Sequence, residues 1–278
     1  MLYASRFLRL TTPPMRGPDV REVQDSLAKL GYYKGVVDGT YGSDTADAVK
    51  KFQSAVGIRP DGVVGPDTWN SLGLSIGPIN INREYQITID TATIQLTLFK
   101  NGAVQNVFPV AVGKPSTPSP IGDWIIIEKQ MDWGGPFGVR WMRLNVPWGS
   151  YGIHGTDTPS SIGTAASHGC IRMRNEDVTT LYSIVPMGTP VKITGQVFTG
   201  RVLQLGVEPG SDVAAVQQRL QVLRFYQGDI DGVYGNQTQN AVIAFQKARK
   251  LVADGVVGPS TYEELEKVYD TALGLKMP

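Results

Sequence analysis

A long internal repeat constrains the architecture of this chain more than any other feature of its sequence. The segment from Asp19 to about Leu72 recurs from Asp212 to about Leu265 at a constant offset of 193 residues (19 to 212), without a gap. Each copy has apolar residues at helical spacing, an Asp-Gly turn, a second apolar helix, another Asp-Gly turn and a short third helix. A unit of roughly 60 residues that flanks a different segment on both sides predicts several small domains.

The residues that match between the copies are mainly apolar, glutamine or turn-forming. The helical pairs are Val20 and Val213, Val23 and Val216, Gln24 and Gln217, Leu27 and Leu220, Phe52 and Phe245, and Gln53 and Gln246. The turn pairs are 38–42 with 231–235 and 61–66 with 254–259. Together they give the pattern D-V-x-x-V-Q-x-x-L, D-G-x-Y-G-x-x-T, A-V-x-x-F-Q and D-G-V-V-G-P-x-T.

This pattern resembles the peptidoglycan-binding module that occurs beside wall-lytic and wall-building enzymes, over nearly the whole of both copies. The resemblance implies binding of glycan or stem peptide. Core packing and turn geometry account for most matched positions by themselves, so we assign no individual ligand contact in either module. Two linked modules that bind one polymer lengthen the time that the protein stays bound, because the first contact raises the effective concentration for the second.

Charge and hydropathy exclude several classes of protein. Lys and Arg number 26 against 25 Asp and Glu, mixed along the chain, which leaves no basic footprint for nucleic acid. No apolar run is long enough to span a bilayer. Arg6 and Arg9 interrupt the first ten residues and no A-x-A site follows, so no signal peptide is visible. We expect a monomer.

Between the two copies the hydrophobic period changes from helical to alternating. Strands are predicted over 85–90, 94–99, 104–112, 123–128, 141–144 and 190–194, with a hairpin turn at Lys100-Asn101-Gly102. One helix is predicted over 175–185. Roughly 110 residues of mostly strand favour a small sandwich or barrel.

The predicted fold class is therefore multidomain α+β, with a central, mainly β, sandwich-like domain between two small three-helix modules. The expected boundaries are 1–14 for an N-terminal segment, 15–76 for the first module, 80–196 for the central domain and 204–278 for the second module. Gly77-Pro78 and 195–201 are the expected joints.

The residues with nucleophilic or basic chemistry gather in one short window of the central domain. The only cysteine, Cys170, lies within 16 residues of both histidines, His154 and His168. A lone cysteine is by itself more often a buried apolar residue than a reactive thiol. Random placement would bring these three residues so close only about 1% of the time, which favours a cysteine nucleophile. Spacing alone does not decide which histidine is its base.

A cysteine nucleophile needs a group that favours the thiolate, a group that orients the base and donors for the developing oxyanion. An imidazole beside the sulfur favours the thiolate. Gly169 allows close backbone approach, so that amides around Gly169 and Cys170 can face an oxyanion. Arg172 can bind a substrate carboxylate through a bidentate fork or form a surface ion pair, and Ser167 can support substrate or shape a turn.

The sequence H-G-T at 154–156, a spacer with Ile162-Gly163 and S-H-G-C-I-R-M at 167–173 resemble the signature of the L,D-transpeptidase (YkuD-type) catalytic domain. The segment T-P-S-P-I-G at 117–122 is similar to the T-P-x-G segment of that family. The resemblance covers about 82–195 and implies a β-sandwich domain. No metal or cofactor is expected, because H-E-x-x-H is absent and two histidines with one cysteine make a poor zinc site.

The resemblance also implies a role for each residue of the window. His154 is the general base paired with Cys170, and the backbone carbonyl of Gly155 orients it. His168, Gly169 and Cys170 build the oxyanion site and the pocket wall. Ser167, Arg172 and Gly155 are the residues expected to bind the substrate.

The implied reaction is acyl transfer on peptidoglycan tetrapeptide stems, through a thioester on Cys170, to give 3→3 cross-links. Transfer to water or to a free D-amino acid would instead give L,D-carboxypeptidase or exchange activity. One alternative is a non-enzymatic wall-binding protein with a degenerate catalytic domain, and the intact motif residues argue against it. Another is a general cysteine protease, which would cleave ordinary L-peptides. Family members are acylated by carbapenems, which implies the same adduct on Cys170. The expected partners are stem peptides and glycan, and the expected location is the cell wall or exterior, including association with a spore.

Overall fold

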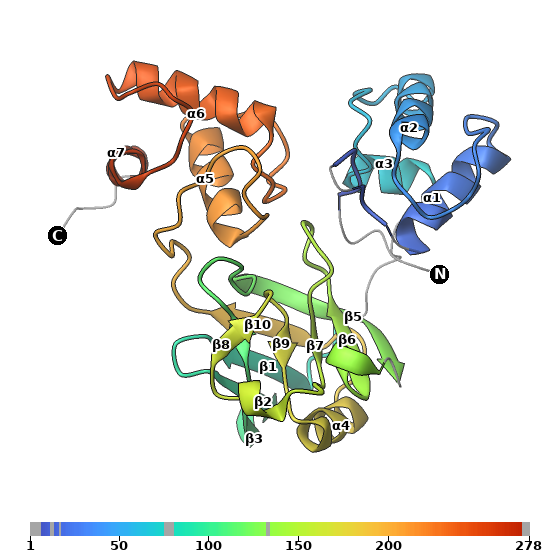
Figure 1. Cartoon of the computed structure of the whole chain (residues 1–278), viewed down its shortest axis with the longest axis vertical. Coiled ribbons are helices and arrows are strands. Elements are labelled where there is room, and N and C mark those ends of the chain that lie inside the picture. Colours follow the sequence, from blue (N-terminus) through green and yellow to red (C-terminus); the bar gives the residue numbers. More distant parts are fainter. Residues whose placement is uncertain (1–6, 12–13, 17, 75–80, 132–133, 274–278) are drawn as a thin grey trace. The chain divides into compact units, whose positions relative to one another are not determined.

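The computed structural model describes residues 7–11, 14–16, 18–74, 81–131 and 134–273 (Figure 1). The chain divides into two compact units, Met1–Asn80 and Ile81–Pro278. The first unit contains one three-helix module, and the second contains the central β domain followed by the other module. This arrangement confirms the predicted α+β fold class. The expected joint at Gly77-Pro78 lies outside the described residues.

The helices of the two modules begin 193 residues apart (18 to 211, 43 to 236, 66 to 259). They are α1 (Pro18–Lys29), α2 (Ser43–Ala55) and α3 (Pro66–Ser71) in the first module, and α5 (Ser211–Val222), α6 (Asn236–Ala248) and α7 (Pro259–Ala272) in the second. Helix α3 stops early because Gly73, with φ of 68°, takes the left-handed conformation that ends a helix. Glu266 stands at the matching position in the second module, and α7 continues through it for 14 residues in total.

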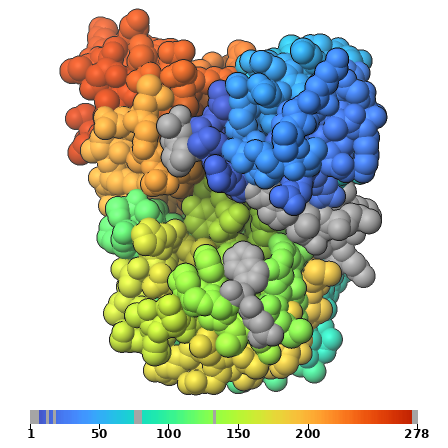
Figure 2. Space-filling model, turned by 45° about the vertical axis from the view of Figure 1, so that its right-hand side comes forward, coloured from blue at the N-terminus to red at the C-terminus, as the bar shows by residue number. Residues whose placement is uncertain are grey.

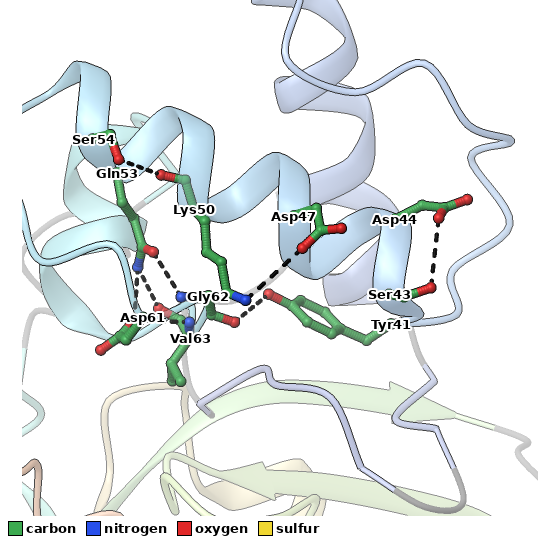
Figure 3. A network of polar contacts seen from close by, with 10 residues as sticks. All are labelled: Tyr41, Ser43, Asp44, Asp47, Lys50, Gln53, Ser54, Asp61, Gly62 and Val63. Carbon is green, nitrogen blue, oxygen red and sulfur yellow. Dashed lines mark hydrogen bonds and ion pairs between the residues drawn. The ribbon is translucent and has the colours of Figure 1, made fainter.

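A buried glutamine organises each turn of the modules. Gln53 Nε2 donates to Asp61 Oδ1 at 3.0 Å and to the Val63 carbonyl at 2.9 Å, while its Oε1 accepts from the Gly62 amide at 2.9 Å (Figure 3). Gln24, Gln217 and Gln246 make the same set of contacts with the Asp-Gly turns that face them. The residues matched between the copies therefore hold the turns together, as expected if core packing and turn geometry account for most matched positions.

The central domain is built on an eight-stranded sheet, which curls (Figure 1), in the order β3-β2-β1-β10-β5-β6-β7-β9. Its strands are β1 (Tyr85–Asp90), β2 (Gln95–Lys100), β3 (Ala103–Pro109), β5 (Gly122–Met131), β6 (Arg140–Leu144), β7 (Gly152–His154), β9 (Ile171–Arg172) and β10 (Pro190–Thr194). A second sheet pairs β4 (Val112–Gly113) with β8 (Ala165–Ser167). Two 3₁₀ turns, η1 (Gly135–Phe137) and η2 (Pro159–Ser161), and helix α4 (Asn175–Ile184) complete the domain.

The predicted strands are present, but the long return strand expected over 104–112 is divided into β3 and β4. The hairpin turn is confirmed, since Asn101 and Gly102 both have positive φ, as a type I′ turn requires. Strands β7, β8 and β9 had no counterpart in the prediction, and they carry the motif residues. No helix in the described part of the chain has the length and apolar character that a bilayer crossing requires.

One apolar core holds these short strands in place. Alternate residues of the long strands, among them Ile87, Ile89, Leu96 and Leu98, are fully buried in it. Ile153 of β7 and Ile171 of β9 join the same core, and α4 adds Val178 and Leu181. The core thus fixes β7, which carries His154, and β9, which begins directly after Cys170.

Candidate active site

The parallel strands β7 and β9 place the motif residues on one face of the sheet. Ile153 lies opposite Ile171, and His154 lies opposite Arg172. Because side chains alternate along a strand, the two isoleucines face the core while His154 and Arg172 face the other side. Burial dominates the pKa shifts of both His154 and Cys170, and the charge of Arg172 adds a smaller effect that lowers the pKa of each.

His154 is a buried, neutral imidazole with a defined tautomer. Its Nδ1 lies 2.5 Å from the carbonyl oxygen of Gly155, and since a carbonyl only accepts, Nδ1 carries the proton. The lone pair is therefore on Nε2. The ring of Trp141 stacks on the imidazole with 5.4 Å between the ring centroids, and the ring of Phe137 approaches it edge-on with 5.2 Å between the centroids. Burial lowers the pKa of His154 to about 4.

Close backbone packing explains the glycine of the H-G-T motif. A Cβ on Gly155 would overlap Oδ1 of Asn175, at the start of α4. That same Oδ1 accepts from the amide of Thr156 at 3.2 Å. On the other side, Gly138 has φ of 62°, and a Cβ there would lie 2.5 Å from the Thr156 amide nitrogen. The loop after η1 is thereby held against the residues that orient His154.

Ser167 shapes the turn that presents the cysteine. Its hydroxyl donates to the carbonyl oxygen of Cys170 at 2.6 Å and accepts from the amide of Gly169 at 3.0 Å. Ser167 is fully buried, so its position matches the turn reading rather than the substrate-supporting one. The amide of Gly169, expected to face an oxyanion, is already used by this contact. Among the described residues none accepts the amide proton of Cys170, which leaves that donor available.

The thiol of Cys170 is neutral at rest. Its Sγ lies 3.8 Å from the carbonyl oxygen of Ser150, to which it donates. Burial raises its pKa to about 11, against smaller opposing effects of the Gly152 backbone and Arg172. We expected the neighbouring imidazole to favour the thiolate. Desolvation instead dominates the pKa of Cys170, and the site holds a neutral thiol and a neutral imidazole.

The two histidines have different surroundings. His168 is exposed, and its Nε2 lies 3.4 Å from Nζ of Lys114, on the loop after β4. A lysine ammonium only donates, so this contact uses the His168 lone pair. His154 instead bonds a carbonyl through Nδ1, which keeps its lone pair on Nε2. In the residues that the structure describes there is also no group of three or more His, Cys, Asp or Glu side chains that could hold a metal.

Tyr151 and the segment 117–122 border the site, and of these two only Tyr151 was not anticipated from the sequence. The ring of Tyr151 lies against Gly169, where an added Cβ would be 2.5 Å from a ring carbon, and burial raises the pKa of Tyr151 to about 12. The segment 117–122 reaches the same turn, because Thr117 Oγ1 donates to the Ser167 carbonyl at 3.3 Å. No local pattern marked Tyr151 or Lys114, since both reach the turn through tertiary packing.

Comparison with known proteins matches each domain of the chain to a known family model. "L,D-transpeptidase catalytic domain" matches residues 84–193, and "Putative peptidoglycan binding domain" matches 16–72 and 209–265. Over 109 residues the chain is 50% identical to "Putative L,D-transpeptidase YkuD" of Bacillus subtilis, which covers 39% of this chain and 65% of that protein. Over 123 residues it is 32% identical to "Putative L,D-transpeptidase YqjB" of Bacillus subtilis, covering 39% and 70%.

Among solved structures, the catalytic domain of an Enterococcus faecium L,D-transpeptidase is 26% identical, with a TM-score of 0.36, over 41% of this chain and 98% of that one. The class is defined by a mainly β domain that carries a buried histidine and a cysteine turn, in a chain with two modules that match a peptidoglycan-binding domain. The chain belongs to the L,D-transpeptidase family, and its flanking modules support peptidoglycan as its partner. It spans 65% and 66% of the length of the two YkuD relatives that it matches.

Proposed function

We propose that this protein forms 3→3 cross-links between peptidoglycan stems through an acyl-enzyme on Cys170. One observation carries the proposal. The Gly155 carbonyl accepts from Nδ1–H of His154, so that a neutral imidazole keeps its Nε2 lone pair as a base. His154 lies on the face of the sheet that also carries Arg172, two residues after Cys170. A buried base of this kind takes a proton readily only when charge develops beside it.

The proposed reaction has two acyl transfers. As Sγ of Cys170 attacks the carbonyl of the third stem residue, normally meso-diaminopimelate, Nε2 of His154 takes the thiol proton. The amide to the terminal D-alanine breaks, and His154 returns the proton to its leaving amine. An amine from a neighbouring stem then attacks the thioester and releases the thiol.

The other residues of the window are assigned supporting roles in this proposal. The amide of Cys170 donates to the oxyanion of the tetrahedral intermediate. Arg172, whose charge lies near both reacting groups, binds a substrate carboxylate. Ser167 and Gly169 fix the turn, and His168 lines the exposed side of the pocket.

The acyl acceptor is tested by the products. Purified protein is incubated with a disaccharide tetrapeptide, and the products are resolved by mass. Cross-linked dimers that lack one D-alanine are expected. Tripeptide alone would identify an L,D-carboxypeptidase, and incorporation of an added D-amino acid would identify exchange.

The nucleophile is tested by substitution and by acylation. Cys170→Ala should lower turnover by about a thousandfold or more while binding to walls is retained. A carbapenem should add its mass to the parent protein and not to the variant. Full turnover by Cys170→Ala would instead point to a wall-binding protein whose apparent activity has another source.

We also propose where the N-terminal module contacts the wall. A hollow of about 590 Å³ lies between the loop 31–35 and α2. Two bases, Lys34 and Lys51, and two acids, Asp44 and Asp47, line it beside Tyr32. Stem peptides carry both amines and carboxylates, so this mixed set of charges suits a zwitterionic peptide. Such binding would keep the enzyme at the cell wall or spore wall.

A further inference from the structure

The segment between β6 and β7 contacts the cysteine turn directly. The Ser150 carbonyl accepts from the Cys170 thiol, and the Tyr151 ring lies on Gly169. The Tyr151 carbonyl in turn accepts from the Leu144 amide at 2.8 Å, which closes the hairpin. A shift of this segment would therefore move both the proton acceptor and the cover of the thiol.

The same segment touches the C-terminal module on its other side. The indole of Trp148 lies so close to Gly232 that an added Cβ would be 2.6 Å from Cδ2 and 2.7 Å from Cε3. Gly232 has φ of 65°, and its amide donates to Gln217 Oε1 at 2.9 Å, so the turn is fixed by the module's own core. Trp124 packs edge-on against Trp148 at 5.4 Å. A rigid turn of the module thus seats a side chain of the catalytic domain.

A second contact joins the same two parts of this unit. Arg201 forms a bidentate pair with the fully buried Asp212, at 2.5 and 2.7 Å, and donates to the Ser116 carbonyl at 3.4 Å. Ser116 precedes Thr117, whose hydroxyl bonds the Ser167 carbonyl. In Figure 2 the orange surface of the module adjoins the green surface of the β domain. Both contacts lead from the module to the turn at 167–170.

We propose that the C-terminal module is a structural part of the catalytic site, with Trp148 as a positioning residue that Gly232 seats. Through this contact the module sets the position of Ser150 and Tyr151 relative to the Cys170 thiol. The module then has a role in acyl transfer that is separate from wall binding. The inference rests on the proposed role of Cys170 as the nucleophile.

The internal repeat supplies a matched control. Gly39 occupies the position of Gly232 in the first module, with φ of 76° and its amide 2.8 Å from Gln24 Oε1. Because both glycines have positive φ, Gly39→Ala and Gly232→Ala introduce backbone strain of the same kind, and Trp148 adjoins Gly232. Comparison of the two substitutions separates loss of the module's fold from loss of the contact.

The test is a double-substitution cycle of Gly232→Ala and Trp148→Leu in the full chain. Each single substitution should lower kcat by about tenfold or more, with KM and wall binding little changed. Together they should cost no more than either alone, because both remove one contact. Gly39→Ala should leave kcat unchanged and should combine additively with Trp148→Leu. Equal effects of the two glycine substitutions, or additive effects of Gly232→Ala and Trp148→Leu, would overturn the proposal.

Alkylation of Cys170 gives a readout that does not depend on transpeptidation. Its rate should rise in Gly232→Ala and Trp148→Leu, because the Ser150 carbonyl no longer holds the thiol proton, and should stay at the parent value in Gly39→Ala. If the variants differ from the parent in this way but the parent forms no cross-linked stem dimer, the proposed function fails while this inference stands. An unchanged alkylation rate in all three variants would contradict the inference alone.

Discussion

At the scale of single residues, burial acts in opposite directions on the two reacting groups. It raises the pKa of Cys170 to about 11 and lowers that of His154 to about 4. A resting thiolate–imidazolium pair requires the thiol to have the lower pKa of the two. Here the order is reversed, so in the proposed reaction the proton moves during attack on the substrate.

The alkylation rate of the free enzyme should follow this order. Because the chain has one cysteine, iodoacetamide reports on Cys170 alone. The rate should be low at pH 7 and rise about tenfold per pH unit towards a midpoint near the raised pKa of about 11. The urea-unfolded chain, with a midpoint near an ordinary thiol pKa of about 8.5, is the reference. A plateau below pH 8 in the folded protein would show that a thiolate is present at rest.

The stability of the second unit should depend on pH through His154. Its folded pKa of about 4 lies below the ordinary value of 6.5, so the unfolded state binds the proton first as the pH falls. Stability from the neutral imidazole is complete above pH 6.5 and is lost towards pH 4, by about 2 to 3 kcal/mol between pH 7 and pH 4.5. Measured by urea unfolding, the free energy of unfolding of the parent should fall by this amount between pH 7 and pH 4.5, and that of His154→Gln should not. His168→Gln, a change of the exposed histidine, should behave like the parent.

At the scale of elements, the long strands and helices could be predicted because each carries several periods of its own pattern. Strands β7 and β9 have three and two residues, too few for a period to show. Their pairing depends on Ile153 and Ile171 entering a core made by distant strands. The motifs therefore named Cys170 and its neighbours, but no local pattern could reveal that Ser167 takes the Gly169 amide.

The glutamine-centred turns predict a large difference between adjacent residues of α5. Gln217 is fully buried and bonds the Asp231-Gly232 turn, whereas Gln218 is exposed. Gln217→Leu should destabilise the module by about 2 to 4 kcal/mol, because it leaves buried amides without an acceptor. Gln218→Leu should change the free energy of unfolding by less than about 0.5 kcal/mol. Similar values in urea unfolding would show that the network contributes little.

At the scale of the whole molecule, the two modules share a scaffold but differ at the hollow of the first. Lys34, Asp44, Asp47 and Lys51 are replaced in the second module by Gln227, Gln237, Asn240 and Ala244. The second module shows that these neutral residues are compatible with the fold. The difference therefore points to separate ligand contacts within one chain.

Exchange of these residues tests the hollow. The fourfold variant Lys34→Gln, Asp44→Gln, Asp47→Asn and Lys51→Ala leaves the net charge at +1, since it removes two bases and two acids. It should weaken cosedimentation with purified peptidoglycan by about tenfold or more, because one of two linked contacts is lost. The reciprocal exchange into the second module is the control for the fold and should not reduce binding. Unchanged cosedimentation of the first variant would rule out the hollow as the contact site.

The reversed order of the two pKa values also bears on the chemical lifetime of the protein. Peroxides attack the thiolate, and a thiol with a pKa of about 11 is ionised in only about one molecule in ten thousand at pH 7. A chain with one cysteine has no second thiol that could capture a sulfenic acid as a disulfide. The low thiolate fraction of Cys170 therefore limits its oxidation in the absence of substrate.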